Sequence, residues 1–464
     1  MIADLKPYPE YKDSGLPWVG SVPGHWDVRR LKSYLVRNDA GVWGTAFDDR
    51  GTVVLRSTEQ SVAGGWRISN PARIRLSDAQ IASALLAVGD LVVTKSSGSA
   101  LHIGKTSLVT PRIAEMECCF SNFLQRLRVS HNSLSPKFAW TLLNSCIGRE
   151  QYVFHTTTTT GLGNLNGTIL GNCVFPFPPL EEQAAIVRFL DWANGRLERA
   201  IRAKRKIITL LNEQKQAIIH RAVTRGLDPN APLKPSGIPW LGDIPAHWEV
   251  TRIKNELECH NTKRIPVSAV ERGTMTSRAY DYYGASGVID KVDDYLFDGE
   301  YLLIAEDGAN LVLRNLPLAI IARGKFWVNN HAHILKPRRG NIEYLAQRLE
   351  TVNYGPWISG AAQPKLTQER LLSITIAVAP PDEQDTIVAY TNEQTRPIVN
   401  TVSRLEHEIA LLREYRTRLT SDVVTGKLDV RAAASRLPQE AAPEMDDEEA
   451  LADETDLDTS ETEA

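Results

Sequence analysis

The side chains best suited to contact a polyanion gather in short polar stretches between strand-like segments. Lys and Arg bind phosphate oxygens, and Ser, Thr, Asn and Gln bind phosphates or the edges of bases. An ordinary solvated loop position is the competing interpretation for each residue. The candidates for DNA contact are Lys95, Ser97, Ser99, His102, Lys105, Thr157, Thr158 and Asn164 in the first half of the chain, and Asn310, Lys325, Asn330, His331, Gln363 and Lys365 in the second.

Catalytic motifs are largely missing. Residues 98–106 come closest to a phosphate-binding loop, but five residues separate Gly98 from Gly104 where the motif needs four. A strand-like run also follows where a helix is required. No HExxH, EF-hand or GxSxG motif occurs, nor the Asn/Asp-Pro-Pro-Tyr/Phe motif of amino-methyltransferases. The sequence therefore predicts a chain without catalysis, metal or cofactor of its own.

Two Pro- and Gly-rich segments resemble each other closely. Residues 12–32 and 234–254 are identical at 12 of 21 positions, at an offset of 222. Each holds two Trp, which are expected to anchor a turn-rich loop on a domain as a structural clasp. His25 and His247 are weak catalytic candidates because no nucleophile or carboxylate accompanies them in the sequence.

Short β-rich runs and one helical run follow each of these entrance segments, which indicates an α+β domain in each half. The expected strands are 51–56, 89–95, 106–110 and 123–129, then 281–290, 299–307, 318–322 and 331–337. The expected helices are 135–154 and 341–352. The loops of the two halves differ in sequence.

A second duplication covers residues 179–228 and 380–429, at an offset of 201 without a gap. Apolar residues recur there at alternating spacings of three and four, which is typical of a coiled-coil seam. We expect two antiparallel helices, each broken near Asn194-Gly195 or Pro397 into a short lead-in and a longer segment of about 30 residues. The residues expected to pair the helices are Ile201, Ile208, Leu211, Ile218, Val402, Leu405, Ile409, Leu412 and Leu419.

Charge is distributed unevenly along the chain. The net charge is -3, but residues 439–464 hold twelve Asp or Glu and no Lys or Arg. The remaining body has 53 basic and 44 acidic residues, about +9, which permits an anionic partner. The acidic tail should be disordered and solubilising. Five cysteines without a CxxC pair suggest reduced thiols, and no signal peptide or membrane span is evident, so a cytoplasmic protein is expected.

The paired helices and entrance segments resemble the specificity subunits of type I restriction–modification enzymes. The resemblance covers residues 10–430 and rests on the PPLEEQ (178–183) and PPDEQ (380–384) motifs and on the Gly15–Trp18 and Gly237–Trp240 segments. It does not extend to the acidic tail. An enzyme acting alone, either a nuclease or a methyltransferase, is one alternative, and a coiled-coil assembly protein is another.

The resemblance implies a fold of two pseudo-symmetric target-recognition domains separated by two long antiparallel helices. The implied domains are 1–178 and 229–379, with helical spacers 179–228 and 380–429 and a tail 430–464. Each domain would read one half of a bipartite, asymmetric double-stranded DNA site, while the helices set the gap. Methyltransferase subunits and restriction subunits would be the partners, and would bring S-adenosylmethionine, ATP and Mg²⁺.

Overall fold

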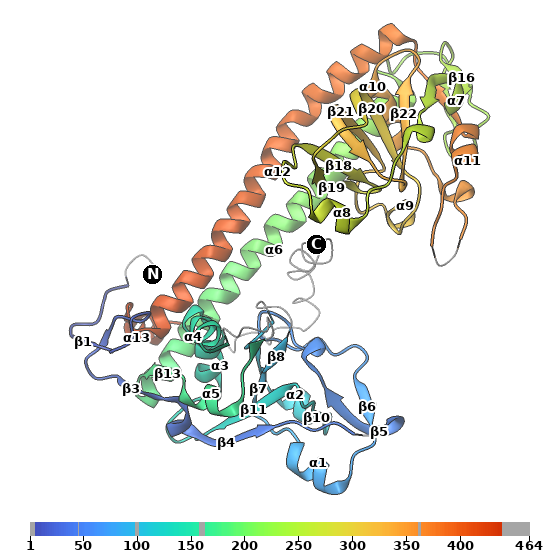
Figure 1. The fold of residues 1–464 in the computed structure, drawn as a ribbon. Helices are drawn as coiled ribbons and strands as arrows, with labels where there is room; N and C mark the ends of the chain where they lie inside the picture. Colours follow the sequence, from blue (N-terminus) through green and yellow to red (C-terminus); the bar gives the residue numbers. More distant parts are fainter. Residues whose placement is uncertain (1–4, 45, 98–101, 157–162, 361–362, 439–464) are drawn as a thin grey trace. The chain divides into compact units, whose positions relative to one another are not determined.

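The computed structural model describes residues 5–44, 46–97, 102–156, 163–360 and 363–438, and the chain forms two compact units (Figure 1). The first unit contains Met1–Ala203 and Glu408–Ala464, and the second contains Lys204–His407. Each unit holds one α+β domain together with parts of both long helices. No helix among the described residues combines the length and apolarity of a membrane span.

The first domain is built on a four-stranded antiparallel sheet in the order β4-β11-β7-β9. A three-stranded sheet, β10-β5-β6, lies against a second apolar cluster. The bounds are β4 Leu35–Ala40, β5 Phe47–Leu55, β6 Ala72–Ile74, β7 Leu91–Thr94, β9 Thr106–Leu108, β10 Cys119–Phe120 and β11 Leu124–Val129. Its helices are α1 Asp78–Ala84, α2 Pro111–Ala114, α3 Pro136–Asn144, α4 Cys146–Thr156 and α5 Gly167–Asn172.

The second domain is built on a six-stranded sheet in the order β17-β22-β20-β21-β18-β19, in which only β18 and β21 run parallel. The bounds are β17 Leu257–Cys259, β18 Tyr280–Gly284, β19 Gly287–Val292, β20 Phe297–Ala305, β21 Ala319–Val328 and β22 Ala332–Pro337. Its helices are α7 Ile253–Glu256, α8 Ala269–Gly273, α9 Asn310–Leu313, α10 Ile342–Glu350 and α11 Gln368–Ser373.

The same small elements flank both domains. Each entrance segment forms a hairpin, β1-β2 in one copy and β14-β15 in the other, and then a strand that pairs with the last strand of its domain. The bounds are β1 Tyr11–Asp13, β2 Ser21–Pro23, β3 Asp27–Arg30 and β13 Val174–Phe177, then β14 Leu233–Pro235, β15 Asp243–Pro245, β16 Glu249–Arg252 and β23 Thr375–Val378. The expected duplicated frame is confirmed.

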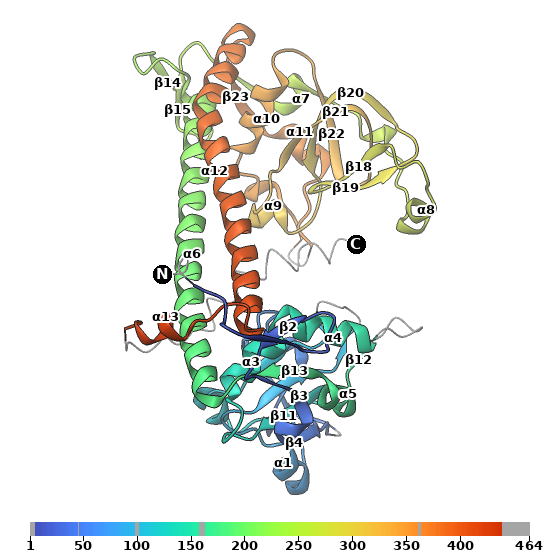
Figure 2. The ribbon, with the colours of Figure 1, turned by 90° about the vertical axis from the view of Figure 1, so that its left-hand side faces the viewer.

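The long helices are continuous, so the expected breaks are wrong. Helix α6 runs from Leu180 to Arg225 and α12 from Pro381 to Val424 (Figure 2). A glycine in a helix costs only about 1 kcal/mol, and the buried neighbours of Gly195 outweigh that cost. Pro397 is exposed and lies inside the helix, whose other turns are fixed by packing. The helix expected at 135–154 does break, at Ser145, which separates α3 from α4.

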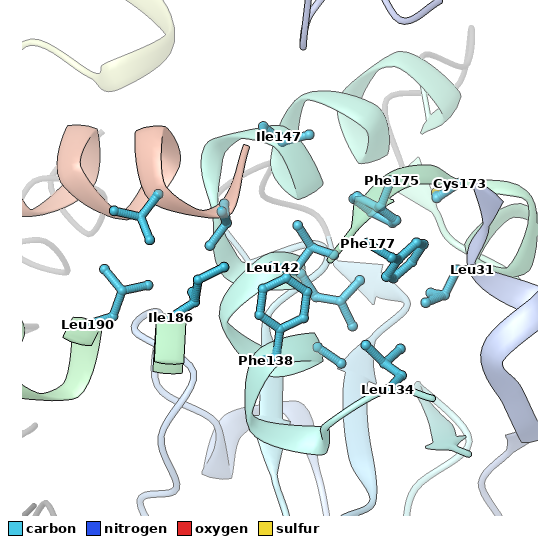
Figure 3. Close-up of a cluster of buried hydrophobic side chains, with 14 of the residues drawn as sticks. Leu31, Leu134, Phe138, Leu142, Ile147, Cys173, Phe175, Phe177, Ile186 and Leu190 are labelled. Carbon is cyan, nitrogen blue, oxygen red and sulfur yellow. The ribbon is translucent and has the colours of Figure 1, made fainter. Parts of the chain in front are cut away.

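Within each unit the start of one long helix packs beside the end of the other. In the first unit, Ile186 and Leu190 share a core with Leu419 and Val423. Figure 3 shows Ile186 beside Phe138 of the domain core and Leu190 directed toward the ribbon of α12. In the second unit, Ala222 and Val223 share a core with Ile387 and Val388. The two helices therefore run antiparallel within each unit, as the sequence predicted.

A glycine with left-handed backbone follows each long helix where it meets an entrance segment. Gly226 and Gly426 have positive φ values of 70° and 75°, as at many helix C-termini. A Cβ on Gly426 would lie 2.3 Å from Pro23, and one on Gly226 would lie 3.6 Å from Pro245. The ends of both helices thus meet the same part of an entrance hairpin, one within each unit.

Candidate functional site

A buried carboxylate joins the first entrance segment to the start of α6. Glu182 accepts hydrogen bonds at 2.8 Å from Trp26 Nε1 and at 2.8 Å from His25 Nε2, and a short hydrogen bond from the Tyr8 hydroxyl. Tyr8, Trp26 and Glu182 are all buried. Burial, and then the bond to Glu182, raises the pKa of Tyr8 far above its usual value, so its hydroxyl remains a donor.

The second copy repeats this arrangement in a more open setting. Glu383 at the start of α12 accepts from His247 Nε2 at 2.7 Å and from Trp248 Nε1 at 3.1 Å. The Glu383 side chain is 26% exposed, whereas that of Glu182 is 5% exposed. No equivalent of the Tyr8 hydroxyl bond is recorded at Glu383 within the described residues.

The glutamine next to each glutamate holds the start of a domain helix. Gln183 accepts from the backbone N–H of Ser135, the N-cap of α3, at 2.8 Å. Gln384 accepts from the backbone N–H of Asn341, the N-cap of α10, at 2.9 Å. Each amide also donates to the carbonyl just before its own long helix. We call these two Glu-Gln pairs the Glu–Gln clamps.

The clamps explain why both histidines belong to the duplicated entrance segments. The sequence alone shows no carboxylate near His25 or His247, because Glu182 and Glu383 lie 157 and 136 residues further along the chain. The sequence did contain one hint of this contact, since the His-Trp pair and the Glu-Gln pair each belong to a duplicated stretch of the chain. The structural interpretation of the histidines is supported, since each bonds to a clamp that fixes a domain on its helix.

Two predicted polar stretches of the first domain are brought together. Strand β8, Ser96–Ser97, pairs with β12, Gly163–Asn164, and the N–H of Leu165 bonds to the carbonyl of Lys95 at 2.7 Å. Lys95 is half-buried, and this burial lowers its pKa. His102 is also half-buried. Ser99, Thr157 and Thr158 lie outside the described residues, as does the side chain of Asn164.

Lys105 lies inside the first domain. It is 3% exposed, and its ammonium donates to the carbonyls of Ser57 and Gln60 at 3.0 and 2.9 Å. Taking this charge out of the domain would remove the ammonium donor of the buried Gln60 carbonyl, at a cost of about 1–3 kcal/mol, whereas the Ser57 carbonyl would keep the Gln60 N–H. Lys105 therefore stabilises the interior of the domain, and the proposed DNA-facing surface does not include it.

In the second domain, five predicted residues occur on loops at one end of the sheet. Asn330 and His331 precede β22, and Asn310 is the first residue of α9. Gln363 and Lys365 lie on one segment, which forms an isolated β-bridge between Lys365 and Asp307. His331 Nδ1 bonds to Asp307 at 2.9 Å. All but Asn310 are exposed. Asn310 instead holds the loop after α9 through two bonds to the backbone of Leu316.

Charged groups below these loops hold them in place. Arg264 donates to Glu306 at 2.6 Å and to the carbonyls of Asn330 and Ala332. Lys365 lies 3.4 Å from the same carboxylate. Burial would raise the pKa of Glu306, but the Arg264 hydrogen bond and the neighbouring cations outweigh it and keep the pKa low. An anionic ligand could draw Arg264 or Lys365 away only in competition with Glu306.

Lys325 lies apart from this cluster. It pairs across the sheet with Asp298, near the start of β20, whereas Glu306 and Asp307 follow the end of that strand. Its ammonium lies 4.4 Å from the centre of the Tyr295 ring and is exposed. At about 3.3 Å per residue, roughly 25 Å of strand separates Lys325 from the loop cluster.

A buried histidine makes the second loop cluster sensitive to acid. His333 donates from Nε2 to the carbonyl of Leu366 at 2.7 Å and accepts at Nδ1 from Asn261 at 2.8 Å, a pattern that needs the neutral ring. Burial lowers its pKa. Its folded pKa lies below the unfolded value of about 6.5, so stability is complete above that pH and falls as the pH drops below it.

We therefore expect residues 259–266 and 363–368 to lose hydrogen-exchange protection as the pH falls from 7.5 to 5.5. His333→Gln keeps a donor and an acceptor but cannot titrate, so it should show a smaller loss after correction for intrinsic exchange. His220 and His260, whose pKa values are also lowered, are present in both proteins and act as internal controls. Equal losses in the two proteins would contradict the assignment to His333.

The predicted helix seam is buried unevenly along the two helices. Ile201, Ile409 and Leu419 are buried, while Ile208, Leu211, Ile218, Val402, Leu405 and Leu412 are half-buried. In the first unit Arg416 also bonds to Glu198 at 2.9 Å, between the two helices. Pairing of the nine named residues stays a prediction.

The described residues contain no group of three or more His, Cys, Asp or Glu able to hold a metal ion. The five cysteines are free thiols, and burial raises the pKa of Cys118 and of Cys119 to about 11. The prominent polar features of the molecule are the two loop surfaces and the two clamps that position them.

Comparison with known proteins gives a consistent result. The model of the type I restriction modification DNA specificity domain matches residues 80–208 and 245–401. A Methanocaldococcus jannaschii protein named as the MjaX type I restriction enzyme specificity subunit is 23% identical over 447 residues, covering 89% of this chain and 96% of its own. A Haemophilus influenzae protein, named as the specificity subunit S.HindORF215P, is 37% identical over 130 residues. That match spans 28% of this chain and 32% of the relative.

One solved structure shows the same fold. A chain described under "Structural basis underlying complex assembly and conformational transition of the type I R-M system" superimposes with a TM-score of 0.57 at 16% identity. The match covers 88% of this chain and 99% of that one. A crystal structure of the HsdS subunit from Thermoanaerobacter tengcongensis has a TM-score of 0.42.

Proposed function

Because the chain belongs to the type I restriction–modification DNA specificity family, we propose that it is the non-catalytic subunit that recognises a bipartite DNA site. Each α+β domain reads one half-site through its polar loops. The two halves of the site differ in sequence, because the loops of the two domains differ. The long helices set the number of base pairs between the half-sites.

The duplicated clamp is the observation that carries this proposal. Glu182-Gln183 and Glu383-Gln384 make matching bonds to an entrance segment and to a helix N-cap. An identical frame therefore holds two domains whose exposed loops have different residues. Proteins with two-fold pseudo-symmetry place two reading heads on DNA at a separation that the connection between them determines. A conserved frame with variable loops fits that division of work.

The partners we propose are two methyltransferase subunits and the restriction subunits, acting on double-stranded DNA in the cytoplasm. S-adenosylmethionine, ATP and Mg²⁺ would be bound by those subunits. Charged positions of α6, namely the half-buried Lys204 and Arg205 and the exposed Lys206 and Glu213, are the candidates for docking the methyltransferase. Phosphate contacts make DNA binding by the assembled complex weaken steeply with salt.

The test is an exchange of one domain. Residues 33–178 are replaced by the equivalent domain of a family member with a different target, and the chain is expressed with its methyltransferase partner. We expect one half of the methylated site to change and the other half and the gap to stay the same. Mapping methylated bases in the host genome measures all three. A change in both halves, or in neither, would contradict modular reading.

A further inference from the structure

The outer face of the first part of α6 is lined with arginine. At 100° per residue, Arg188, Arg196, Arg199 and Arg202 fall on one side of the helix, together with Trp192. All four arginines are exposed. The buried seam residues Ile186, Leu190, Ala193, Leu197 and Ile201 fall on the opposite side. We call this exposed side the arginine face.

The acidic residues within this stretch are directed to other elements. Asp191 pairs with Lys137 at 3.4 Å, and Glu198 with Arg416 at 2.9 Å. Arg196 also lies against the Trp192 ring, with its guanidinium carbon 5.2 Å from the ring centre. The face thus combines four cations with an aromatic surface, a composition suited to an acidic peptide segment.

The chain itself delivers such a segment to one end of this face. Helix α13, Arg431–Ser435, packs its alanines into the core of the first unit and lies beside α6 in Figure 2. Leu437 is buried, and Arg188 Nη2 donates to the carbonyls of Leu437 and Pro438 at 2.5 and 3.1 Å. The described part of the chain therefore ends at Pro438, beside the first arginine of the face.

We propose that the acidic segment 439–464 binds the arginine face of α6 within the same chain. The segment has twelve acidic residues and no basic ones. From Arg188 to Arg202 the helix rises only about 21 Å, a distance that 26 residues at up to about 3.3 Å each easily cover. A short tether gives an effective concentration in the millimolar range, so the tail outcompetes dilute external anions. The docked tail shields the basic body from non-specific polyanions until a tighter ligand displaces it.

Arginine footprinting tests this proposal on the full-length chain. Phenylglyoxal modification is followed by mass spectrometry in the native protein and in a variant whose twelve tail carboxylates are changed to amides (Asp→Asn, Glu→Gln). At low salt we expect Arg196 and Arg199 to react at least about threefold faster in the variant, because the tethered anion is lost. Arg50, exposed in the same unit, should react equally in both. At 1 M salt, where the screening length is about 3 Å, the difference should disappear.

Three further arms separate the possible occupants of the face. A synthetic peptide of residues 439–464 added to the amide variant should restore protection. Protection that grows with protein concentration would assign the face to a second copy and overturn the proposal. Protection that appears in both proteins only with added duplex DNA would assign it to nucleic acid, and would also overturn it. Equal rates in both proteins without additions would show that the tail does not bind there.

Discussion

Glu182→Ala is expected to destabilise the first entrance segment by about 3–5 kcal/mol, because it leaves buried donors without an acceptor. The Trp26 indole and the Tyr8 hydroxyl have no solvent to replace the carboxylate, since both side chains are buried. The measurement is the local opening free energy from hydrogen exchange across residues 20–32. A global unfolding curve is less suitable, because a chain of several domains does not unfold in two states.

The second copy of the clamp supplies the matched control. Glu383→Ala removes an equivalent carboxylate that is partly exposed and whose histidine partner is 51% exposed, so water replaces part of the interaction. We expect a loss of about 1–2 kcal/mol across residues 243–254. Glu182→Gln, which keeps an acceptor oxygen, should cost less than Glu182→Ala. Equal losses at the two clamps would show that burial does not determine their strength.

Lengthening both long helices by one heptad should move the preferred DNA site to a wider gap. Seven residues add about 10.5 Å and rotate the seam by only about 20°. One DNA turn of about 34–36 Å holds 10–10.5 base pairs, so the gap should grow by about three base pairs. Insertions after Lys206 and after Arg404 keep both clamps and both domains intact. The expected loss of affinity for the original site is about a thousandfold or more, the usual ratio of specific to non-specific binding.

The affinity should return on a site with the wider gap, measured by methylation protection with the partner subunit present. Insertions of five residues at the same positions form the control. They rotate the apolar residues that follow the insertion by about 140° and so expose the seam. That protein should lose helix content and bind neither site. A heptad variant that still prefers the original gap would contradict the role of the helices in spacing.

Much of the fold could be predicted because local patterns and tertiary packing agree. The expected strands at 123–129 and 331–337 match β11 and β22 closely, since apolar residues in them face a core on the sheet. The helix breaks were wrong for the opposite reason. Gly195 and Pro397 are locally unfavourable, but each falls in a helix of more than 40 residues whose other turns are fixed by packing. The opposite error occurs at Ser145. The sequence predicted one helix over 135–154, but this single capping residue ends α3 before α4 begins.

The candidate site was harder to predict than the fold. Residue type suggested Lys105 for DNA contact, but its ammonium satisfies carbonyls inside the domain. Nothing in the sequence near Lys105 distinguishes that role from exposure. The partners of His25 and His247 are more than 130 residues away, so only the fold reveals them. The pairing of β8 with β12, by contrast, brings together two stretches that composition had already singled out.

The junction between helix end and entrance hairpin bears on how this chain arose. In the second unit, Gly226 continues through peptide bonds into β14. In the first unit, the corresponding junction is made by contact alone, where the N–H of Asp429 bonds to the carbonyl of Lys6 and the Tyr11 hydroxyl bonds to that of Gly426. A helix end and an entrance hairpin thus meet in both units, with a covalent link in one and by contact alone in the other. A half-length ancestor could have made this junction twice by pairing with itself, so that a gene duplication and fusion would have needed no new packing.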